Sequence, residues 1–387
     1  MHEIICLCDY GIEDLAKKEI LEITEKTAES KEYGVLKFQG TNEDIIKLNY
    51  SSRLLSRILI PLGEFDISKR KEGLIDLEEK GKKILYKTFL KKGQSFAFAS
   101  DRFGRHDYNS VDINRTLGSS VFSVLGEENI KVDLTYPDVL FRAIINKDKC
   151  SIYFDTTGKI ELYKRGYRVL SKSSDIRPTL ACAMLQFSNW NPKQILLDPF
   201  CKAGIIPIES AMMARAIPPG IFRKDKFGFN NVVGFEDYEK IFEKINKKIK
   251  KSAETKIFAY DRTMGDISMS KKNAQFADVF EEITFGRFEA EWLDVKFEKN
   301  SMDLILTNPP YGYIKENIKD LEKIYKEFFY SANFILKEKG KICFISSKHR
   351  TAEKMFKTNN FKSVFERNLG ASERNPRIYV IEKCSVQ

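Results

Sequence analysis

The chain has 387 residues, of which 42% are hydrophobic and 31% charged, and it contains no apolar run of the ~20 residues that a membrane helix needs. These values exclude a transmembrane enzyme and predict a globular protein of two or three domains, since a domain has about 100–200 residues. The 65 Lys and Arg residues exceed the 55 Asp and Glu residues, which gives a net charge of +10. This basic excess favours a polyanionic partner such as nucleic acid, although a thermophile surface or a lysine-rich genome also produces it.

The cysteines, the histidines and the N-terminus bear on the compartment and on metal binding. Seven cysteines are scattered without CxxC spacing, so we expect neither a disulfide framework nor a zinc ribbon. His2, His106 and His349 have no ligand spacing with one another or with a cysteine. The first residues show no basic segment followed by an apolar stretch and a cleavage site, so we expect no signal peptide. We therefore predict a cytoplasmic protein without a metal centre and without membrane attachment.

The N-terminal half alternates short strands and helices. A strand over residues 3–8 precedes a helix with a 3.6-residue apolar period, and a later strand leads to Thr41, a candidate N-cap of the next helix. Further strands and one helix fall between residues 95 and 154. The sequence thus predicts two small α+β units in this half.

A basic connector follows the N-terminal half. Six basic and two acidic residues lie between Lys159 and Arg177, with Tyr163 and Tyr167 among them. Basic side chains neutralise phosphates and aromatic rings stack on bases. This segment is either an RNA contact or an ordinary linker packed between domains.

The C-terminal half has the rhythm of strand, turn and helix. Four short, unbroken apolar runs occur at residues 195–197, 257–260, 304–306 and 342–345. Such strands are buried on both faces, which predicts a parallel sheet in a doubly wound α/β domain. The ligands of such a domain bind at the carboxyl ends of the strands.

Candidate ligand-binding residues follow three of these strands. Asp198 opens a loop that ends at Gly204 and begins a helix, and small residues there let backbone N–H groups approach a ligand. Asp261 lies at the tip of the next strand, where it either binds ribose hydroxyls or caps a helix. Glu289 lies near a neighbouring strand end and could accept a hydrogen bond from an adenine amino group.

The strongest signal is the sequence Asn308-Pro309-Pro310-Tyr311 directly after the third strand. Two prolines remove two backbone donors and fix φ twice, which presents carbonyl groups and the Asn side chain to the cleft. This arrangement suits methylation of an exocyclic amino group, whose lone pair is delocalised into the ring. Two acceptors aimed at its N–H bonds, the Asn308 side-chain oxygen and the Pro309 carbonyl, would favour a pyramidal nitrogen in line with the methyl donor. Tyr311 would stack on a base that is extruded or already unpaired.

With these motifs in place, the chain resembles the THUMP-domain guanine-N2 RNA methyltransferases, and among them most closely the archaeal enzymes that methylate guanosine 6 of tRNA. The resemblance rests on the sequences DRFGRHDYNS (101–110), DTTG (155–158), LYKRGYR (162–168), RPTLA (177–181), NPPYG (308–312) and RIYVIEK (377–383), together with the Asp198 loop. Several long motifs in the same order make a chance resemblance improbable.

The resemblance implies a mixed α/β and α+β architecture. It implies an N-terminal ferredoxin-like domain (1–60), a THUMP RNA-binding domain (61–158), a basic linker (159–176) and a Rossmann-like class I methyltransferase domain (177–387). The implied cofactor is S-adenosyl-L-methionine, and the implied partner is tRNA, bound through its acceptor stem and 3′ end. The sequence identifies no protein partner.

The resemblance also assigns site residues by motif position. Cofactor contacts are implied for Arg177, Pro178, Thr179, Asp198, Cys201, Lys202, Ala203, Gly204, Asp261, Glu289 and Ala290, catalysis for Asn308, Pro309, Pro310 and Tyr311, and RNA contacts for Arg102, Arg105, Arg115, Lys164, Arg165 and Arg168. The family loop usually reads Gly-Ser-Gly where this chain has Lys202-Ala203-Gly204. Lys202 adds a Cβ atom and a cation near a sulfonium. Its ammonium either turns outward or pairs with the cofactor carboxylate.

Three alternatives stay open. An enzyme that methylates guanine N2 in large-subunit ribosomal RNA carries similar N-terminal motifs, but the C-terminal sequence and the lack of a second methyltransferase unit favour tRNA. Lys202 also leaves open an RNA-binding protein that no longer methylates, although such a protein has no physical need of the Asn308 loop. A DNA adenine-N6 methyltransferase shares the loop chemistry but does not explain a THUMP-like half.

Overall fold

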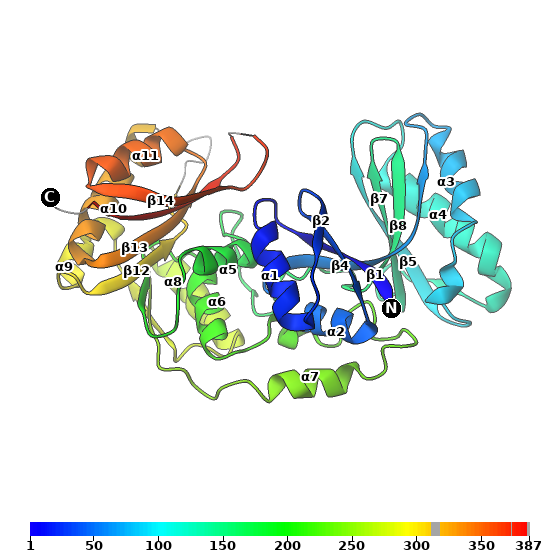
Figure 1. Cartoon of the computed structure of the whole chain (residues 1–387), viewed down its shortest axis with the longest axis horizontal. Helices are drawn as coiled ribbons and strands as arrows, with labels where there is room; N and C mark the ends of the chain where they lie inside the picture. Colours follow the sequence, from blue (N-terminus) through cyan, green and yellow to red (C-terminus); the bar gives the residue numbers. More distant parts are fainter. Residues whose placement is uncertain (311–317, 373, 385–387) are drawn as a thin grey trace. The chain divides into compact units, whose positions relative to one another are not determined.

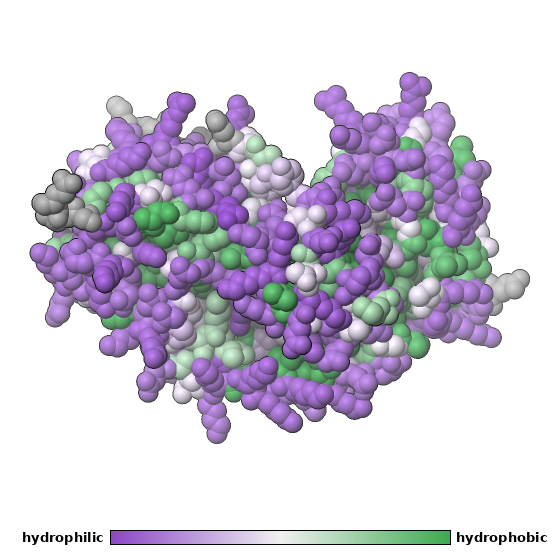
Figure 2. Space-filling model, viewed as in Figure 1, coloured by the Kyte–Doolittle hydropathy of each residue, from purple (hydrophilic) through white to green (hydrophobic). Residues whose placement is uncertain are grey.

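The computed structural model describes residues 1–310, 318–372 and 374–384 (Figure 1). The chain forms two compact units, and each is built on one β-sheet. The first unit contains Met1–Cys8, Lys17–Leu162 and Arg223–Lys244, and the second contains Asp9–Ala16, Tyr163–Phe222 and Ile245–Gln387. Within the described ranges no helix has the length and apolar content to cross a bilayer. On the face drawn in Figure 2, hydrophilic side chains cover most of the surface and hydrophobic ones are scattered in small groups.

The sheet of the first unit has eight strands in the order β2-β3-β1-β4-β8-β7-β5-β6. The strands are β1 (His2–Cys8), β2 (Glu29–Glu32), β3 (Val35–Gly40), β4 (Leu55–Asp66), β5 (Ser95–Phe103), β6 (Lys131–Val132), β7 (Val139–Asn146) and β8 (Lys149–Asp155). The helices around them are α1 (Glu13–Thr24), α2 (Asn42–Ser51), α3 (Gly73–Gly81) and α4 (Ser110–Leu125), with short 3₁₀ turns at Tyr86–Thr88 and Gly126–Glu128.

The predicted N-cap of α2 is confirmed. The Thr41 hydroxyl accepts a hydrogen bond from the Asp44 N–H group (3.3 Å), and the Asp44 carboxylate accepts one from the Thr41 N–H group (2.7 Å). This reciprocal pair satisfies two backbone donors that a helix start otherwise leaves unpaired.

Strand β4 is shared by the two α+β units that the sequence predicted. Its first residues pair antiparallel with β1, where Ile58 lies opposite Cys6. From Leu59 to Asp66 it pairs antiparallel with β8. The two predicted α+β units therefore form one continuous sheet within the first compact unit, because β4 pairs with a strand of each.

Residues 223–244 lie within the C-terminal half of the sequence but pack in the first unit. They include most of α7 (Tyr238–Asn246) and an aromatic cluster in which Phe229 and Phe235 are fully buried and stack with centroids 5.5 Å apart. Phe242 stacks on Tyr50 at 3.9 Å. The Arg223 guanidinium donates to the carbonyl oxygens of Thr157, Ile160 and Glu161 at 2.5–3.0 Å. The segment thus supplies core side chains to the N-terminal half.

The second unit has seven strands in the order β11-β10-β9-β12-β13-β15-β14. The strands are β9 (Ile195–Asp198), β10 (Lys256–Asp261), β11 (Ile283–Arg287), β12 (Met302–Thr307), β13 (Leu336–Ser346), β14 (Phe361–Asn368) and β15 (Arg377–Lys383). The helices are α5 (Pro178–Phe187), α6 (Ile205–Ala214), α8 (Met264–Phe276), α9 (Leu293–Lys296), α10 (Ile318–Ile335) and α11 (His349–Thr358), with 3₁₀ turns at Pro219–Arg223 and Ala290–Trp292.

The four apolar runs of the C-terminal half form β9, β10, β12 and β13, and they are parallel, which confirms the predicted doubly wound sheet. Successive residues of a strand point to opposite faces. Leu196 and Leu304 pack with α5, α6 and α8, whereas Leu197 and Ile305 pack with α10 and α11. Strand β15 is antiparallel to both of its neighbours, so the sheet is mixed at this side.

The core role of residues 223–244 can be tested with Phe229→Ala. Removal of a fully buried Phe ring leaves a cavity, so we expect the first unit to lose about 3–5 kcal/mol of stability. Hydrogen exchange of the β4 and β8 amides reports the free energy of opening. Phe103→Ala is the matched control, because Phe103 belongs to the same unit and is 59% exposed. Equal protection in the two variants would contradict a core role for the segment.

Candidate active site

The predicted site residues meet at one edge of the second sheet. Asp261 ends β10, Asp198 ends β9, and Asn308 directly follows β12. These three strands are adjacent and parallel, in the order β10-β9-β12. Their carboxyl ends therefore lie side by side, where an open α/β sheet binds its ligands.

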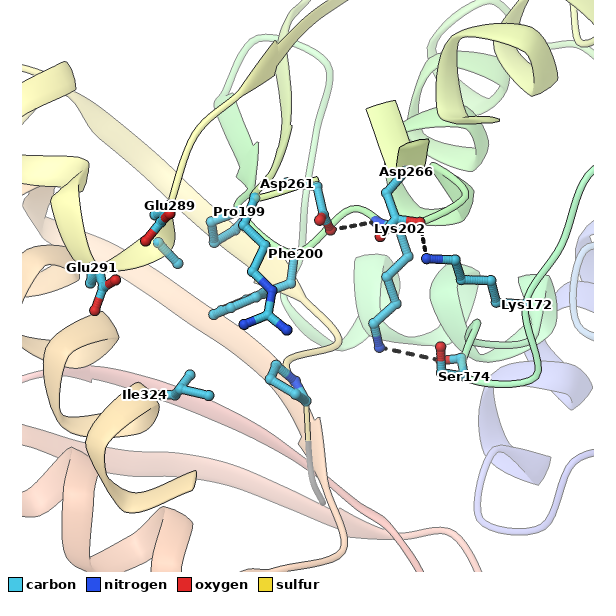
Figure 3. A pocket seen from close by; sticks show the side chains of 13 residues that line it. Lys172, Ser174, Pro199, Phe200, Lys202, Asp261, Asp266, Glu289, Glu291 and Ile324 are labelled. Carbon is cyan, nitrogen blue, oxygen red and sulfur yellow. Dashed lines mark hydrogen bonds and ion pairs between the residues drawn. The ribbon is translucent and has the colours of Figure 1, made fainter. Parts of the chain in front are cut away.

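An open pocket occupies this edge (Figure 3). Its described lining contains five residues that the sequence predicted: Lys202, Asp261, Glu289, Ala290 and Pro310. It also contains Pro199 and Phe200 of the predicted loop after Asp198. The sequence did not single out the other lining residues, which are Lys172, Ser174, Arg262, Asp266, Glu291 and Ile324. Figure 3 shows Glu289 and Glu291 at the end of the pocket opposite Lys172 and Ser174. A smaller adjoining cavity is lined by Asp198, Cys201, Lys202 and Asn308, among others.

Asp261 is a pocket residue and is not the helix cap. Its carboxylate accepts hydrogen bonds from the backbone N–H groups of Lys202 (3.1 Å) and Thr263 (3.2 Å). The N-cap of α8 is Thr263, whose hydroxyl accepts from the Asp266 N–H group. Burial raises the pKa of Asp261. A carboxylate has about four acceptor sites, so Asp261 can accept further hydrogen bonds beside these two. It lies at the end of β10, where a ribose can be held.

Asp198 joins two strands of the site. Its buried carboxylate accepts a hydrogen bond from the Thr307 hydroxyl (2.6 Å) and another from the Phe200 N–H group (3.1 Å). Burial raises the pKa of Asp198 to about 7, although the two hydrogen bonds oppose the shift. The residue thus fixes the end of β9 against the end of β12 and shapes the loop after it.

The loop after Asp198 has a strained backbone. Lys202 has a φ of +48° and Gly204 a φ of +81°, a region that residues with a Cβ atom rarely adopt. A Cβ atom at Gly204 would lie 2.1 Å from the Ser270 Oγ atom, so only glycine fits there. The loop is held to β10, since the Cys201 N–H group donates to the Tyr260 carbonyl (3.0 Å). Ala203 is buried in the core and does not line the described pocket.

The Lys202 ammonium does not turn outward. It donates to the Ser174 carbonyl oxygen at 3.2 Å, as Figure 3 shows, and burial lowers its pKa. Lys202 also lines the pocket, so its side chain is within reach of a ligand there. Its pairing with a cofactor carboxylate stays a prediction.

The two polar atoms of the Asn308 side-chain amide differ in their contacts. Its Nδ2 atom donates to the same Ser174 carbonyl at 3.2 Å. Its Oδ1 atom is buried and has no hydrogen-bond partner among residues 1–310, 318–372 and 374–384. Tyr311, predicted to stack on the base, lies outside the described residues.

The residues predicted at the start of α5 are not among the described residues that line the pocket. The Arg177 guanidinium donates to Asp9 Oδ1 (2.7 Å) and lies over the Tyr163 ring, 5.1 Å from its centroid. The Thr179 hydroxyl donates to the other Asp9 oxygen. Pro178 is the first residue of α5, a position that suits proline. These contacts hold the start of α5 to the segment Asp9–Ala16, and a cofactor role for the three residues stays a prediction.

Five of the six predicted RNA-binding residues fall into two groups. Arg105, Arg115 and Lys164 have exposed side chains. Arg102 is half-buried and donates to the His106 carbonyl (3.4 Å), and Arg168 pairs with Asp175 at 3.2 Å. The three exposed side chains are accessible to phosphates. The guanidinium groups of Arg102 and Arg168 already contact oxygen atoms of the fold.

Arg165 lies in the interior. Its side chain is 1% exposed, and its Nε atom lies 3.1 Å from the Glu209 carboxylate on α6. The Tyr167 hydroxyl donates to the same carboxylate oxygen (2.8 Å), and the Cys182 thiol lies 3.1 Å from the other. Arg165 therefore anchors the connector to the second unit instead of presenting a cation to RNA. The basic connector is packed here as a structural element.

Three family models match the chain. A ferredoxin-like domain model matches residues 3–59, a THUMP domain model residues 72–155, and a model described as an RMKL-like methyltransferase domain residues 165–376. These matches, together with the strand-end site, define a THUMP-domain methyltransferase.

Similarity to individual proteins extends over nearly the whole chain. The tRNA (guanine(6)-N2)-methyltransferase of Methanocaldococcus jannaschii is 35% identical over 367 residues, which are 93% of this chain and 94% of that protein. The ribosomal RNA large subunit methyltransferase K/L of Psychromonas ingrahamii is 29% identical and covers 83% of this chain, but the match spans 43% of that protein. The crystal structure of SMU.472 in complex with SAH has the same fold, with a TM-score of 0.81 at 21% identity over 100% of this chain and 99% of that one. The chain belongs to the tRNA (guanine(6)-N2)-methyltransferase family.

Adjacent cations of the connector allow a test of their different roles. Arg165→Met should cost about 3–5 kcal/mol, because it leaves the Glu209 charge buried without its cation. Lys164→Ala should cost much less stability, because an exposed lysine contributes at most about 1 kcal/mol, and it should weaken RNA binding. Urea unfolding and a titration with tRNA measure the two effects. The double variant Arg165→Met/Glu209→Met should recover part of the stability. An Arg165→Met protein as stable as the wild type would contradict this role.

Proposed function

We propose that this enzyme methylates the exocyclic N2 atom of a guanosine in tRNA, with nucleotide 6 of the acceptor stem as its target and S-adenosyl-L-methionine as the methyl donor. The Oδ1 atom of Asn308 at the end of β12 carries this proposal, because it is buried and has no hydrogen-bond partner among the residues that the structure describes. A buried acceptor without a donor costs about 1–3 kcal/mol. A substrate amino group supplies the missing donor.

The residues of the pocket fit S-adenosyl-L-methionine by their chemistry. Asp261 offers a carboxylate to the ribose hydroxyls, and the loop from Asp198 to Gly204 brings backbone groups close to the ligand. Glu289 forms a hydrogen bond with Glu291 that raises its pKa, and Glu289 also offers an acceptor to the adenine amino group. Arg177, Pro178, Thr179, Cys201, Ala203 and Ala290, together with the backbone of Lys202, complete the proposed cofactor set. When bound, the cofactor supplies an electrophilic methyl group on a sulfonium.

The Asn308 loop would prepare the amino group for transfer. The guanine N2 nitrogen is a weak nucleophile, because its lone pair is delocalised into the ring. The Asn308 oxygen and the Pro309 carbonyl would each accept one N–H bond and so favour a pyramidal nitrogen. Pro310 fixes the backbone of this loop, and Tyr311 would stack on the extruded base.

The N-terminal half would bind the acceptor stem and the 3′ end. We propose a ferredoxin-like domain (1–60), a THUMP domain (61–158), a linker (159–176) and a catalytic domain (177–387), with residues 223–244 packed in the N-terminal unit. The exposed side chains of Arg105, Arg115 and Lys164 suit phosphate contacts. The seven cysteines are free thiols, which suits work on tRNA in the reducing cytoplasm.

A second candidate is methylation of large-subunit ribosomal RNA. The 29% identity to the Psychromonas enzyme favours it, but that match spans less than half of the relative. The match to the M. jannaschii enzyme spans 94% of that relative and supports tRNA instead. Parallel assays with tRNA, ribosomal RNA and duplex DNA separate these substrates.

Catalysis can be tested with Asn308→Ala. We expect the rate of methyl transfer to fall by about 10²–10³-fold, the scale for loss of one preorganised hydrogen-bonding group, while the affinity for S-adenosylmethionine changes little. Transfer of labelled methyl to tRNA and mass analysis of the nucleosides measure the rate and the product. Asn191→Ala, a change of the same type at an exposed position of the second unit, is the control. Full activity of Asn308→Ala would refute the proposed chemistry.

Recognition of the 3′ end can be tested with truncated tRNA. If the N-terminal half holds the 3′ end, tRNA that lacks its terminal CCA should be methylated poorly, because the target base is no longer placed in the pocket. Initial rates are compared for matched transcripts with and without CCA. Equal rates would contradict this mode of recognition.

A further inference from the structure

The Ser174 carbonyl lies in a turn that is fixed from several sides. The Lys172 N–H group donates to the Asp175 carboxylate (2.7 Å), and the Asp175 N–H group donates to the Lys172 carbonyl (3.2 Å). Just before the turn, the Leu170 backbone exchanges two hydrogen bonds with the Asn273 side chain on α8, at 2.9 and 3.1 Å. These contacts hold the backbone of the turn, but none of them is made to the Ser174 carbonyl oxygen itself.

Two side chains of the site converge on this carbonyl. The Lys202 ammonium donates to it from the loop after β9, and the Asn308 Nδ2 atom donates to it from the end of β12, both at 3.2 Å. A carbonyl oxygen has two lone pairs, so it can accept both hydrogen bonds. The Ser174 carbonyl thus links the cofactor loop to the catalytic loop.

This shared acceptor determines which way the Asn308 amide faces. A carboxamide carries a donor on one side and an acceptor on the other. Since Nδ2 is engaged by Ser174, Oδ1 is the atom left for the substrate, and it has no other partner in the described part of the chain. A flipped amide would place two oxygens together and turn a donor toward the substrate amine, which is a donor itself.

We propose that Lys202 is a positioning residue for methyl transfer: its ammonium holds the Ser174 carbonyl, and that carbonyl orients Asn308 with its oxygen toward the substrate amine. This inference rests on the proposed function of Asn308. It gives a role to a lysine whose left-handed backbone conformation would favour glycine.

The test uses Lys202→Met and Lys202→Gly in the full chain. The methionine keeps most of the side-chain volume, and the glycine suits the positive φ, so at least one variant should fold as the wild type does. We expect the single-turnover rate at saturating tRNA and S-adenosylmethionine to fall about tenfold in both, the scale of a hydrogen bond from a charged group. The Kd of S-adenosylhomocysteine should stay within about twofold. Lys272→Met, an exposed lysine on α8, is the control and should be unchanged.

A double-mutant cycle shows whether Lys202 acts through Asn308. In the Asn308→Ala background, Lys202→Met should change the rate by less than about twofold, because the group that it positions is gone. Equal effects in both backgrounds would overturn the proposal. A weaker Kd with an unchanged rate would overturn it as well, and would assign Lys202 to the cofactor carboxylate. If the wild-type enzyme transfers no methyl group to tRNA, the proposed function itself fails.

Discussion

The hydrogen bond from the Thr307 hydroxyl to the buried Asp198 carboxylate joins the ends of β9 and β12, and the remainder of the site depends on it. It places the cofactor loop and the Asn308 loop at one edge of the sheet. The low polarity that raises the Asp198 pKa to about 7 also strengthens the hydrogen bonds around it. The backbone of each loop is then fixed independently, by Asp261 at Lys202 and by two prolines after Asn308.

Much of the catalytic unit could be predicted because its signals are local. An unbroken apolar run is a direct consequence of burial on both faces, so β9, β10, β12 and β13 were recognisable. Parallel strands bring their carboxyl ends together, and Asp198, Asp261 and Asn308 follow such strands. Cap chemistry is equally local, as Thr41 shows. Each of these predictions requires only the order of residues within a few positions.

Other features depend on contacts between distant segments, which the order of residues does not reveal. Ser174 carries no chemical signal, because its backbone carbonyl is the group that contacts Lys202 and Asn308. Arg165 looks like its neighbour Lys164 in the sequence, and only its approach to Glu209 buries it. Residues 223–244 fall between two strands of the catalytic sheet, where a crossover helix would be expected, but their aromatic side chains fill the core of the other unit.

Two unfavourable features of the folded chain meet at the Ser174 carbonyl. Lys202 holds a left-handed backbone that costs roughly 1–2 kcal/mol without glycine, and Asn308 buries an acceptor with no described donor. Folding alone gives no reason for either, since a glycine and an apolar side chain would remove both costs. Local strain and an unsatisfied polar atom tend to occur where function requires them. The Lys202 ammonium donates to the Ser174 carbonyl, and the same carbonyl accepts from the Asn308 Nδ2 atom, which leaves Oδ1 for the substrate. In the proposed reaction both costs therefore serve one requirement, an acceptor ready for an amino group.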